Sequence, residues 1–194
     1  MLAKRRIERR VVVALVVWAA AASGGLYAVA AHGARAGAAA EAPETLRAEL
    51  HTSGRATIVV AAHPSCPCTR ATLRELDRIA RDTHGAADVV VLFAGSERDR
   101  VGVELRRAAE AIPGARVVDD PARAIAKSLG AHTSGTVLFY DADGALRFSG
   151  GITPSRGHEG DSAGADEIRA LVAGATRGHA TTPVFGCPLA RTTP

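Results

Sequence analysis

The stretch at residues 57–70, TIVVAAHPSCPCTR, carries two of the chain's three cysteines, Cys66 and Cys68. Its apolar first half, residues 57–62, predicts a buried strand. Apolar residues recur after it at helical spacing, as at Leu73, Leu76 and Ile79, and predict an amphipathic helix. Cysteines at a turn between strand and helix are typical of redox or metal sites.

Composition limits what this turn can belong to. The chain has 194 residues, 47% of them hydrophobic and only 4% aromatic, which suits one domain with an aliphatic core. The net charge of +4 is already present in residues 1–10, which hold five Lys or Arg and one Glu. The remainder is neutral overall, so we exclude a nucleic-acid partner that needs a basic face on the folded domain.

The N-terminal segments predict a membrane anchor. Residues 1–10 form a basic cytoplasmic segment, and residues 11–31 contain no charge over a length that spans a bilayer as a helix. The positive-inside rule keeps the N-terminus inside the cell and exports everything after it to the periplasm or another extracytoplasmic space, where cysteines meet oxidising conditions. A cleaved signal peptide with small residues at 28–30 is the alternative.

The rest of the chain divides into three parts. Residues 32–42 are rich in Ala and Gly and are expected to be a linker; residues 43–175 form the domain, and residues 176–194 form a tail with Cys187. Within the domain we expect strands at 57–62, 88–94, 115–118, 135–140 and 145–149, and helices at 44–51, after Cys66, at 96–112, from 120, and from 161 or 162. This order predicts an α/β fold with three layers and a mixed sheet ending in an antiparallel hairpin.

The cysteine turn, the segment 117–130 and the hairpin sequence TVLFYDADG at 136–144 resemble the thioredoxin superfamily. The similarity covers roughly residues 43–174. The segment before the hairpin looks like the extra strand and helix of exported, membrane-anchored thioredoxins and of the peroxiredoxin and SCO-type copper branches. The combination of HPSCPCTR, FSGGIT, RGHEGD and FGCPL is similar to the RedB-like group.

The cysteines suggest the chemistry. Pro67 suits the first position of a helix, which makes Cys66 its N-cap, where the helix dipole favours a thiolate. The CxC spacing of Cys66 and Cys68 differs from the family's CxxC, and a disulfide between them requires a non-helical backbone. Cys187 is the other candidate partner, as a resolving thiol or as a covalent staple for the tail. That the CxC pair is incidental is a further alternative.

A metal site competes with the redox interpretation. Thiolates and imidazole suit Cu(I) or Zn, and His63 lies close to Cys66 and Cys68 in sequence. The SCO resemblance implies copper held by Cys66, Cys68 and His132, with His132 one residue out of register. A surface or capping role is the plainer interpretation of either histidine.

The resemblance also implies where a substrate binds. Thioredoxins carry a cis-proline opposite the cysteines, and this chain has Gly135 there, after Ser134; we expect both residues in the substrate groove. The polar loop 150–164 passes near the active site in such folds, so His158 is expected to contact substrate, with Arg156 and Glu159 as further candidates. The alternative is a solvated loop in which Asp161 caps the last helix.

Three functions follow. The first is a membrane-anchored, exported thiol–disulfide oxidoreductase without a bound cofactor, acting on protein or small-molecule thiols and disulfides through Cys66, Cys68 and Cys187. The second is a copper-handling protein of SCO-like type. The third is a non-catalytic thioredoxin-like interaction module.

Overall fold

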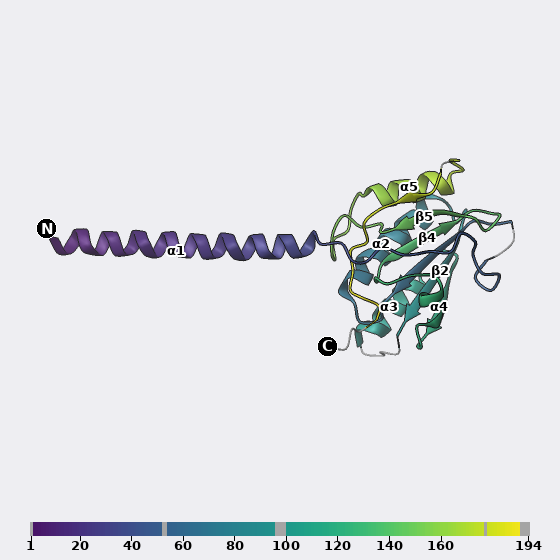
Figure 1. Ribbon diagram of the computed structural model, residues 1–194, viewed down its shortest axis with the longest axis horizontal. Helices are drawn as coiled ribbons and strands as arrows, with labels where there is room; N and C mark the ends of the chain where they lie inside the picture. The colour runs from purple at the N-terminus through teal and green to yellow at the C-terminus, as the bar shows by residue number, and fades with distance from the viewer. Residues whose placement is uncertain (1, 52–53, 96–99, 177, 191–194) are drawn as a thin grey trace. The chain divides into compact units, whose positions relative to one another are not determined.

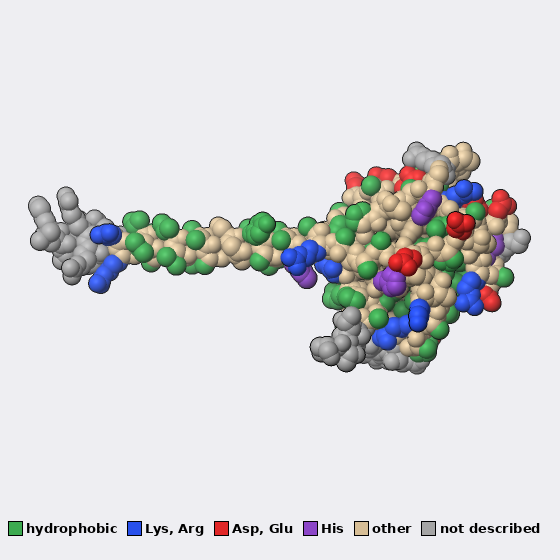
Figure 2. Space-filling view, viewed as in Figure 1, with side chains coloured by type: hydrophobic (Ala, Val, Ile, Leu, Met, Phe, Trp, Pro, Cys, Tyr) green, Lys and Arg blue, Asp and Glu red, His purple; other side chains and the backbone are tan. Residues whose placement is uncertain are grey.

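The computed structural model describes residues 2–51, 54–95, 100–176 and 178–190. The chain forms two compact units, Met1–Arg35 and Ala36–Pro194. The first is the single helix α1 (Leu2–Gly33), whose segment Arg9–Gly33 is long and apolar enough to cross a membrane. Figure 2 shows apolar side chains along this helix, and Val11, Trp18 and Leu26 are among those exposed. The predicted N-terminal apolar helix is confirmed.

The second unit is built on one six-stranded sheet (Figure 1). The strands are β1 (Thr57–Ala62), β2 (Asp88–Ala94), β3 (Ala115–Asp120), β4 (Thr136–Tyr140), β5 (Leu146–Gly150) and β6 (Ala180–Thr181). Their spatial order is β3-β2-β1-β4-β5-β6. Strand β1 is parallel to β2 and antiparallel to β4, and β4 and β5 form the predicted antiparallel hairpin. The sheet is therefore mixed, as expected.

Helices and irregular segments cover both faces of the sheet. On one face lie α2 (Pro67–Asp82), α3 (Arg100–Glu110) and α5 (Ala163–Val172), and on the other lies the short α4 (Ala124–Ser128). Strand β1 shows why both faces are apolar: Ile58 and Val60 enter the core under α2, whereas Val59 and Ala61 enter the core on the α4 side. These two cores make the predicted three-layer arrangement, and the continuous apolar run of β1 reflects burial on both sides.

Two predicted helices differ from the structure. The expected helix at 44–51 does not form, because Leu46 donates its N–H to Gly144 and Glu44 accepts from Leu146, which pairs this segment with the hairpin. Strand β3 extends to Asp120, so α4 begins later than predicted. The Asp120 carboxylate then accepts the N–H of Ala126 inside α4. In the 96–112 helix, residues 96–99 lie outside the described part of the chain.

Residues 36–42, expected to belong to the linker, contact the domain. Gly37 donates its N–H to Val184 in the tail at 2.7 Å, and Glu41 donates to Gly130 at 3.1 Å. The hydroxyl of Thr133 donates to the Ala38 carbonyl at 2.8 Å. The compact unit accordingly begins at Ala36 and not at Pro43. We call residues 36–42 the N-terminal strap.

Candidate functional site

The site begins where β1 ends and α2 starts. Cys66 is the N-cap of α2, with an extended backbone (φ −93°, ψ 120°), and Pro67 is the first helical residue. This is the cap predicted from sequence. An extended cap lies outside the helical repeat, so the two side chains are not held on opposite sides of one helix, and the backbone at Cys66 is non-helical. Both side chains turn toward the same place.

Three thiols meet at this point. The sulfur atoms of Cys66, Cys68 and Cys187 all lie within 4.8 Å of one another, and all three cysteines are free. Cys66 and Cys68 are 1% and 8% exposed, whereas Cys187 is half-buried. The site is thus assembled from the first turn of α2 and from a tail about 120 residues later in the chain.

Main-chain pairing holds the tail in position. The N–H of Ser134 donates to the Cys187 carbonyl at 2.8 Å, and the N–H of Leu189 donates to His132 at 2.8 Å, an antiparallel arrangement beside the start of β4. Further back, β6 pairs with β5. Gly186 packs directly against the backbone of Ser134, because a Cβ built on Gly186 would be 1.8 Å from the Ser134 carbonyl oxygen. Only glycine permits this approach.

Ser134 also supports the cysteine turn from behind. Its hydroxyl accepts the N–H of His63 at 2.9 Å and shares a hydrogen bond of 2.9 Å with the hydroxyl of Thr69. Thr69 donates in turn to the His63 carbonyl at 3.0 Å. Ser134 is fully buried, so the structure places it as a brace between the turn and the tail.

Gly135 has a different function in the structure from that of a proline. Its N–H donates to the Ala61 carbonyl at 2.8 Å, a bond that proline cannot make. Its φ is +89°, and a Cβ there would lie 2.9 Å from the hydroxyl oxygen of Thr72. A glycine at this position thus joins the end of β1 to the start of β4 and leaves room for α2.

Hydrogen bonds favour a thiolate at Cys66. Burial by itself raises the pKa of this thiol, but hydrogen bonds from the Cys187 thiol and from the backbone N–H groups of Cys187, Cys68 and Thr69 lower it. The net direction is a lowered pKa. Cys66 is therefore the group of the three that ionises first, and the thiolate is the nucleophilic form.

The other two thiols stay protonated when Cys66 is ionised. Burial and the negative charge of Cys66 raise the pKa of Cys68. For Cys187, burial and then the hydrogen bond to Cys66 raise the pKa to about 12. The positive charge of Arg156, whose guanidinium donates to the carbonyl of Gly186 next to Cys187, lowers both pKa values and so opposes these shifts. The result is one thiolate with two neighbouring thiols that donate to it.

The loop 150–164 supplies Arg156, whose guanidinium donates to the Gly186 carbonyl beside Cys187. His158 is exposed, and its Nδ1 contacts the Arg156 carbonyl oxygen at 2.8 Å. His132 is exposed and is not part of the three-sulfur group, while the Nδ1 of His63 accepts the N–H of Ser65. The structure thus brings Arg156 to the thiols but does not bring any of these three histidines into their cluster.

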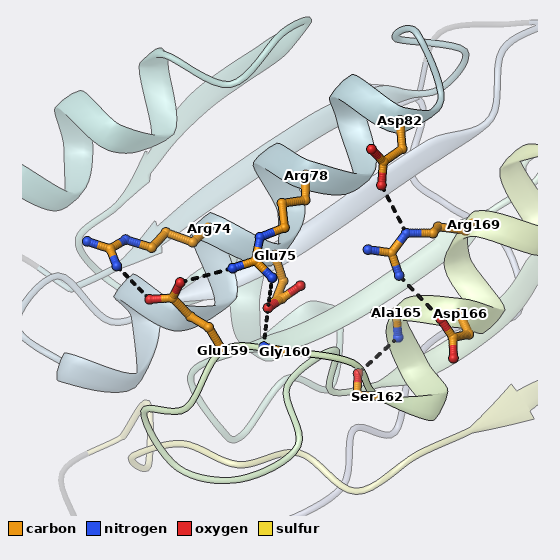
Figure 3. A network of polar contacts seen from close by, with 10 residues as sticks. All are labelled: Arg74, Glu75, Arg78, Asp82, Glu159, Gly160, Ser162, Ala165, Asp166 and Arg169. Atoms are coloured by element: carbon orange, nitrogen blue, oxygen red, sulfur yellow. Dashed lines mark hydrogen bonds and ion pairs between the residues drawn. The ribbon is translucent and has the colours of Figure 1, made fainter.

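Sequence reasoning missed the contacts that anchor this loop. Glu75 of α2 is 1% exposed, and its carboxylate accepts the N–H of Gly160 and pairs with Arg78 at 3.0 Å. Glu159 pairs with Arg74 at 2.7 Å and with Arg78 at 3.2 Å (Figure 3). Helix α5 is capped by Ser162, whose side chain accepts the N–H of Ala165, and not by Asp161, the other residue considered from the sequence. A glutamate on an amphipathic helix gives no sequence signal that a distant loop will bury it.

Comparisons with known proteins concern the fold. No protein-family profile matches the chain, and no curated protein matches it. An uncharacterized conserved protein from Geobacillus kaustophilus is similar in structure, with a TM-score of 0.59 and 21% identity over 80% of this chain and 91% of that one. A hypothetical protein from Sinorhizobium meliloti matches with a TM-score of 0.56 and 22% identity over 71% and 80% of the two chains.

A disulfide oxidoreductase secreted by Mycobacterium tuberculosis also matches, with a TM-score of 0.45 and 19% identity over 66% of this chain and 86% of that one. The architecture of the present chain decides its class: cysteines between β1 and α2, a parallel β1–β2–β3 half, and the β4–β5 hairpin followed by α5. The fold is thioredoxin-like. Strand β3 and helix α4 lie between α3 and the β4–β5 hairpin in the chain.

Proposed function

We propose that the protein is a membrane-anchored, exported thiol–disulfide oxidoreductase. The observation that carries the proposal is the meeting of three free thiols at the N-terminus of α2. Helix α1 is the proposed anchor, with its basic N-terminal end in the cytoplasm and the domain outside. The β3–α4 unit supports our placing of the chain beside the peroxiredoxin and SCO-related branch and the RedB-like group.

Cys66 starts the exchange. Its thiolate attacks one sulfur of a partner disulfide, which forms a mixed disulfide and releases the partner's other sulfur as a thiolate that takes up a proton. Cys187 completes it: its thiol loses a proton, attacks the Cys66 sulfur, and releases the partner's second sulfur. The protein ends with a Cys66–Cys187 disulfide, and the partner gains two electrons and two protons. The same steps reversed oxidise a partner dithiol.

The positions of the two candidate resolving thiols favour Cys187. A Cys66–Cys68 bridge closes a three-residue ring that includes Pro67 and the first turn of α2, where the disulfide geometry is constrained. Cys187 lies after β6, in a described segment that belongs to no helix. It therefore approaches Cys66 without unwinding α2, and Cys68 remains as a third thiol next to the bridge.

The test uses the reduced full-length protein in detergent and a small aromatic disulfide at neutral pH. We expect rapid release of the aromatic thiol, and we expect Cys66→Ser to abolish the fast phase because it removes the thiolate that attacks first. Alkylation at limiting reagent, mapped by mass spectrometry, should modify Cys66 before the other two. Fast exchange that persists in Cys66→Ser would contradict the role of Cys66 as the attacking thiolate, whereas a wild-type protein without fast exchange would favour the non-catalytic module.

A further inference from the structure

Beyond thiol exchange, we propose that Cys66, Cys68 and Cys187 form a three-coordinate thiolate site for Cu(I) when all three are reduced. This inference rests on the arrangement of the sulfur atoms and does not depend on which disulfide the protein exchanges. Binding involves no electron transfer: one Cu(I) ion enters, each coordinating thiol gives up its proton, and three sulfur–metal bonds form.

The sulfur atoms are close to the spacing that one ion requires. Because they lie within 4.8 Å of one another, there is a point that lies within about 2.8 Å of all three. Metal–sulfur bonds in proteins are about 2.3 Å for Zn and comparable first-row ions. A contraction of about 0.5 Å or less per sulfur, well within side-chain rotation, would complete such a site.

The ligand set selects a soft monovalent ion. All three ligands are sulfur, and within the described part of the chain no His, Asp or Glu joins this group. Structural zinc in proteins is almost always four-coordinate and would need a fourth ligand here. Cu(I) is a soft ion that thiolate ligands favour, and three thiolates are enough for the site that we propose. Cys66 and Cys68 are shielded from solvent, which protects Cu(I) from oxidation and from a fourth, water ligand.

Two further features fit this use, the charge of Arg156 and the exposure of Cys187. Arg156 holds the Gly186 carbonyl and brings a positive charge to the rim, which partly offsets the surplus negative charge of three thiolates around one monovalent cation. Cys187 is half-buried and provides the open side from which an ion can arrive. The site therefore has shielded ligands on α2 and an accessible ligand on the tail.

This ligand set differs from the SCO-like one expected from sequence. That set used Cys66 and Cys68 with His132, but His132 is exposed and its carbonyl is engaged by the N–H of Leu189 in the tail. The tail thus supplies a thiolate where the sequence argument placed an imidazole. The two sets give opposite predictions for variants of His132 and Cys187.

The experiment titrates Cu(I), held by a colorimetric Cu(I) chelator, into the reduced full-length protein in detergent under anaerobic conditions. We expect one Cu(I) per chain and three sulfur neighbours in the X-ray absorption spectrum. Cys187→Ser should weaken binding by more than about 100-fold, since it removes a ligand, and loss of groups that merely support ligands already costs 10–100-fold. His132→Ala is the matched control and should leave the affinity unchanged.

Two results would overturn the proposal. One is an affinity that does not change in Cys187→Ser. The other is a nitrogen neighbour that disappears in His132→Ala. Oxidation of wild-type protein to the Cys66–Cys187 disulfide should also abolish binding, because only one thiol remains. Thiol exchange is measured on metal-free protein, so failure of the copper site and failure of the oxidoreductase function are separate outcomes.

Discussion

The two segments that supply the thiols are built in different ways. Cys66 and Cys68 sit on a turn that its own sequence specifies, with a buried strand before it and Pro67 at the first helical position after it. Cys187 sits on a tail with no periodic pattern, which is held by main-chain bonds to Ser134 and His132 and by the strap. The reactive sulfur is thus fixed locally, while its partner depends on contacts between distant segments.

The largest expected effect separates the two candidate partners of Cys66. In Cys187→Ser the mixed disulfide between Cys66 and a substrate should persist, with resolution slowed by more than about 100-fold, because a positioned intramolecular thiol acts at a high effective concentration. Trapped adducts are counted by intact-protein mass spectrometry after a quench with acid.

The paired variant is Cys68→Ser. It should still resolve the adduct through Cys187, and peptide mapping should find the Cys66–Cys187 bridge. If instead Cys68→Ser traps the adduct and Cys187→Ser does not, the tail is a structural element, and the CxC pair alone performs the exchange.

The next largest effect is expected from a substitution that displaces the tail and leaves all three cysteines in place. Gly186→Ala puts a Cβ against the Ser134 carbonyl, so the tail must shift away from the site. We expect bridge formation between Cys66 and Cys187 to slow by about tenfold, and the free energy of unfolding to fall by about 1–3 kcal/mol, as for other overpacked sites. Rapid-quench alkylation measures the first quantity and urea unfolding the second.

Gly178→Ala is the matched control, because it lies on the same tail and a Cβ there meets nothing within 4 Å. Both quantities should stay at the wild-type values. If Gly186→Ala and Gly178→Ala gave the same rate of bridge formation and the same free energy of unfolding, the close packing of Gly186 on Ser134 would not be what positions Cys187.

A smaller effect is expected from removing the hydroxyl of Ser134, which braces the cysteine turn against the tail. Ser134→Ala leaves the part-buried N–H of His63 without its acceptor, which we expect to cost about 1–3 kcal/mol in the free energy of unfolding. Urea unfolding of the reduced protein measures it, with the half-exposed Ser155→Ala as the control. Exchange with a small disulfide should also slow. A variant that keeps wild-type stability would show that the brace is dispensable.

The smallest effect lies at the hairpin, away from both thiol segments. Burial raises the pKa of Asp141, but hydrogen bonds from the N–H groups of Ala145 and Asp143 and from Arg147 lower it overall. The pKa of Asp141 is thus lower in the folded state than in the unfolded state. Ionised Asp141 therefore stabilises the fold at any pH above its unfolded pKa of about 3.9, and this stabilisation is lost as the pH falls through the folded-state pKa. The urea concentration at the midpoint of unfolding should therefore decrease as the pH is lowered from 5 to 2.

Asp141→Asn should lower the midpoint at pH 7 and weaken its dependence on pH in the acid range. The rate of thiol exchange at pH 7 should not change, because the hairpin turn contributes nothing to the sulfur cluster. A change in that rate would show that the hairpin turn and the thiol site are linked.

Local sequence was enough to predict most of the fold. Strand β1, the start of α2 at Pro67 and the β4–β5 hairpin follow from apolar runs, a proline and the turn sequence DADG, whose signals lie within a few residues of the structure they specify. The prediction of a helix at 44–51 was wrong for the complementary reason. This segment pairs with the hairpin, so its structure depends on residues about 100 positions away, which override a weak local preference for helix.

The sequence by itself therefore determined the apolar N-terminal helix, the cysteine turn and Cys66 as the N-cap. Only the tertiary structure decided that Cys187 meets Cys66 and Cys68, that Ser134 braces the turn from inside, and that Glu75 is buried under the loop at 159–160. The physical reason is range: capping and periodicity act within one or two turns of chain, whereas the position of a tail without periodicity is set by hydrogen bonds and packing with residues far away in sequence.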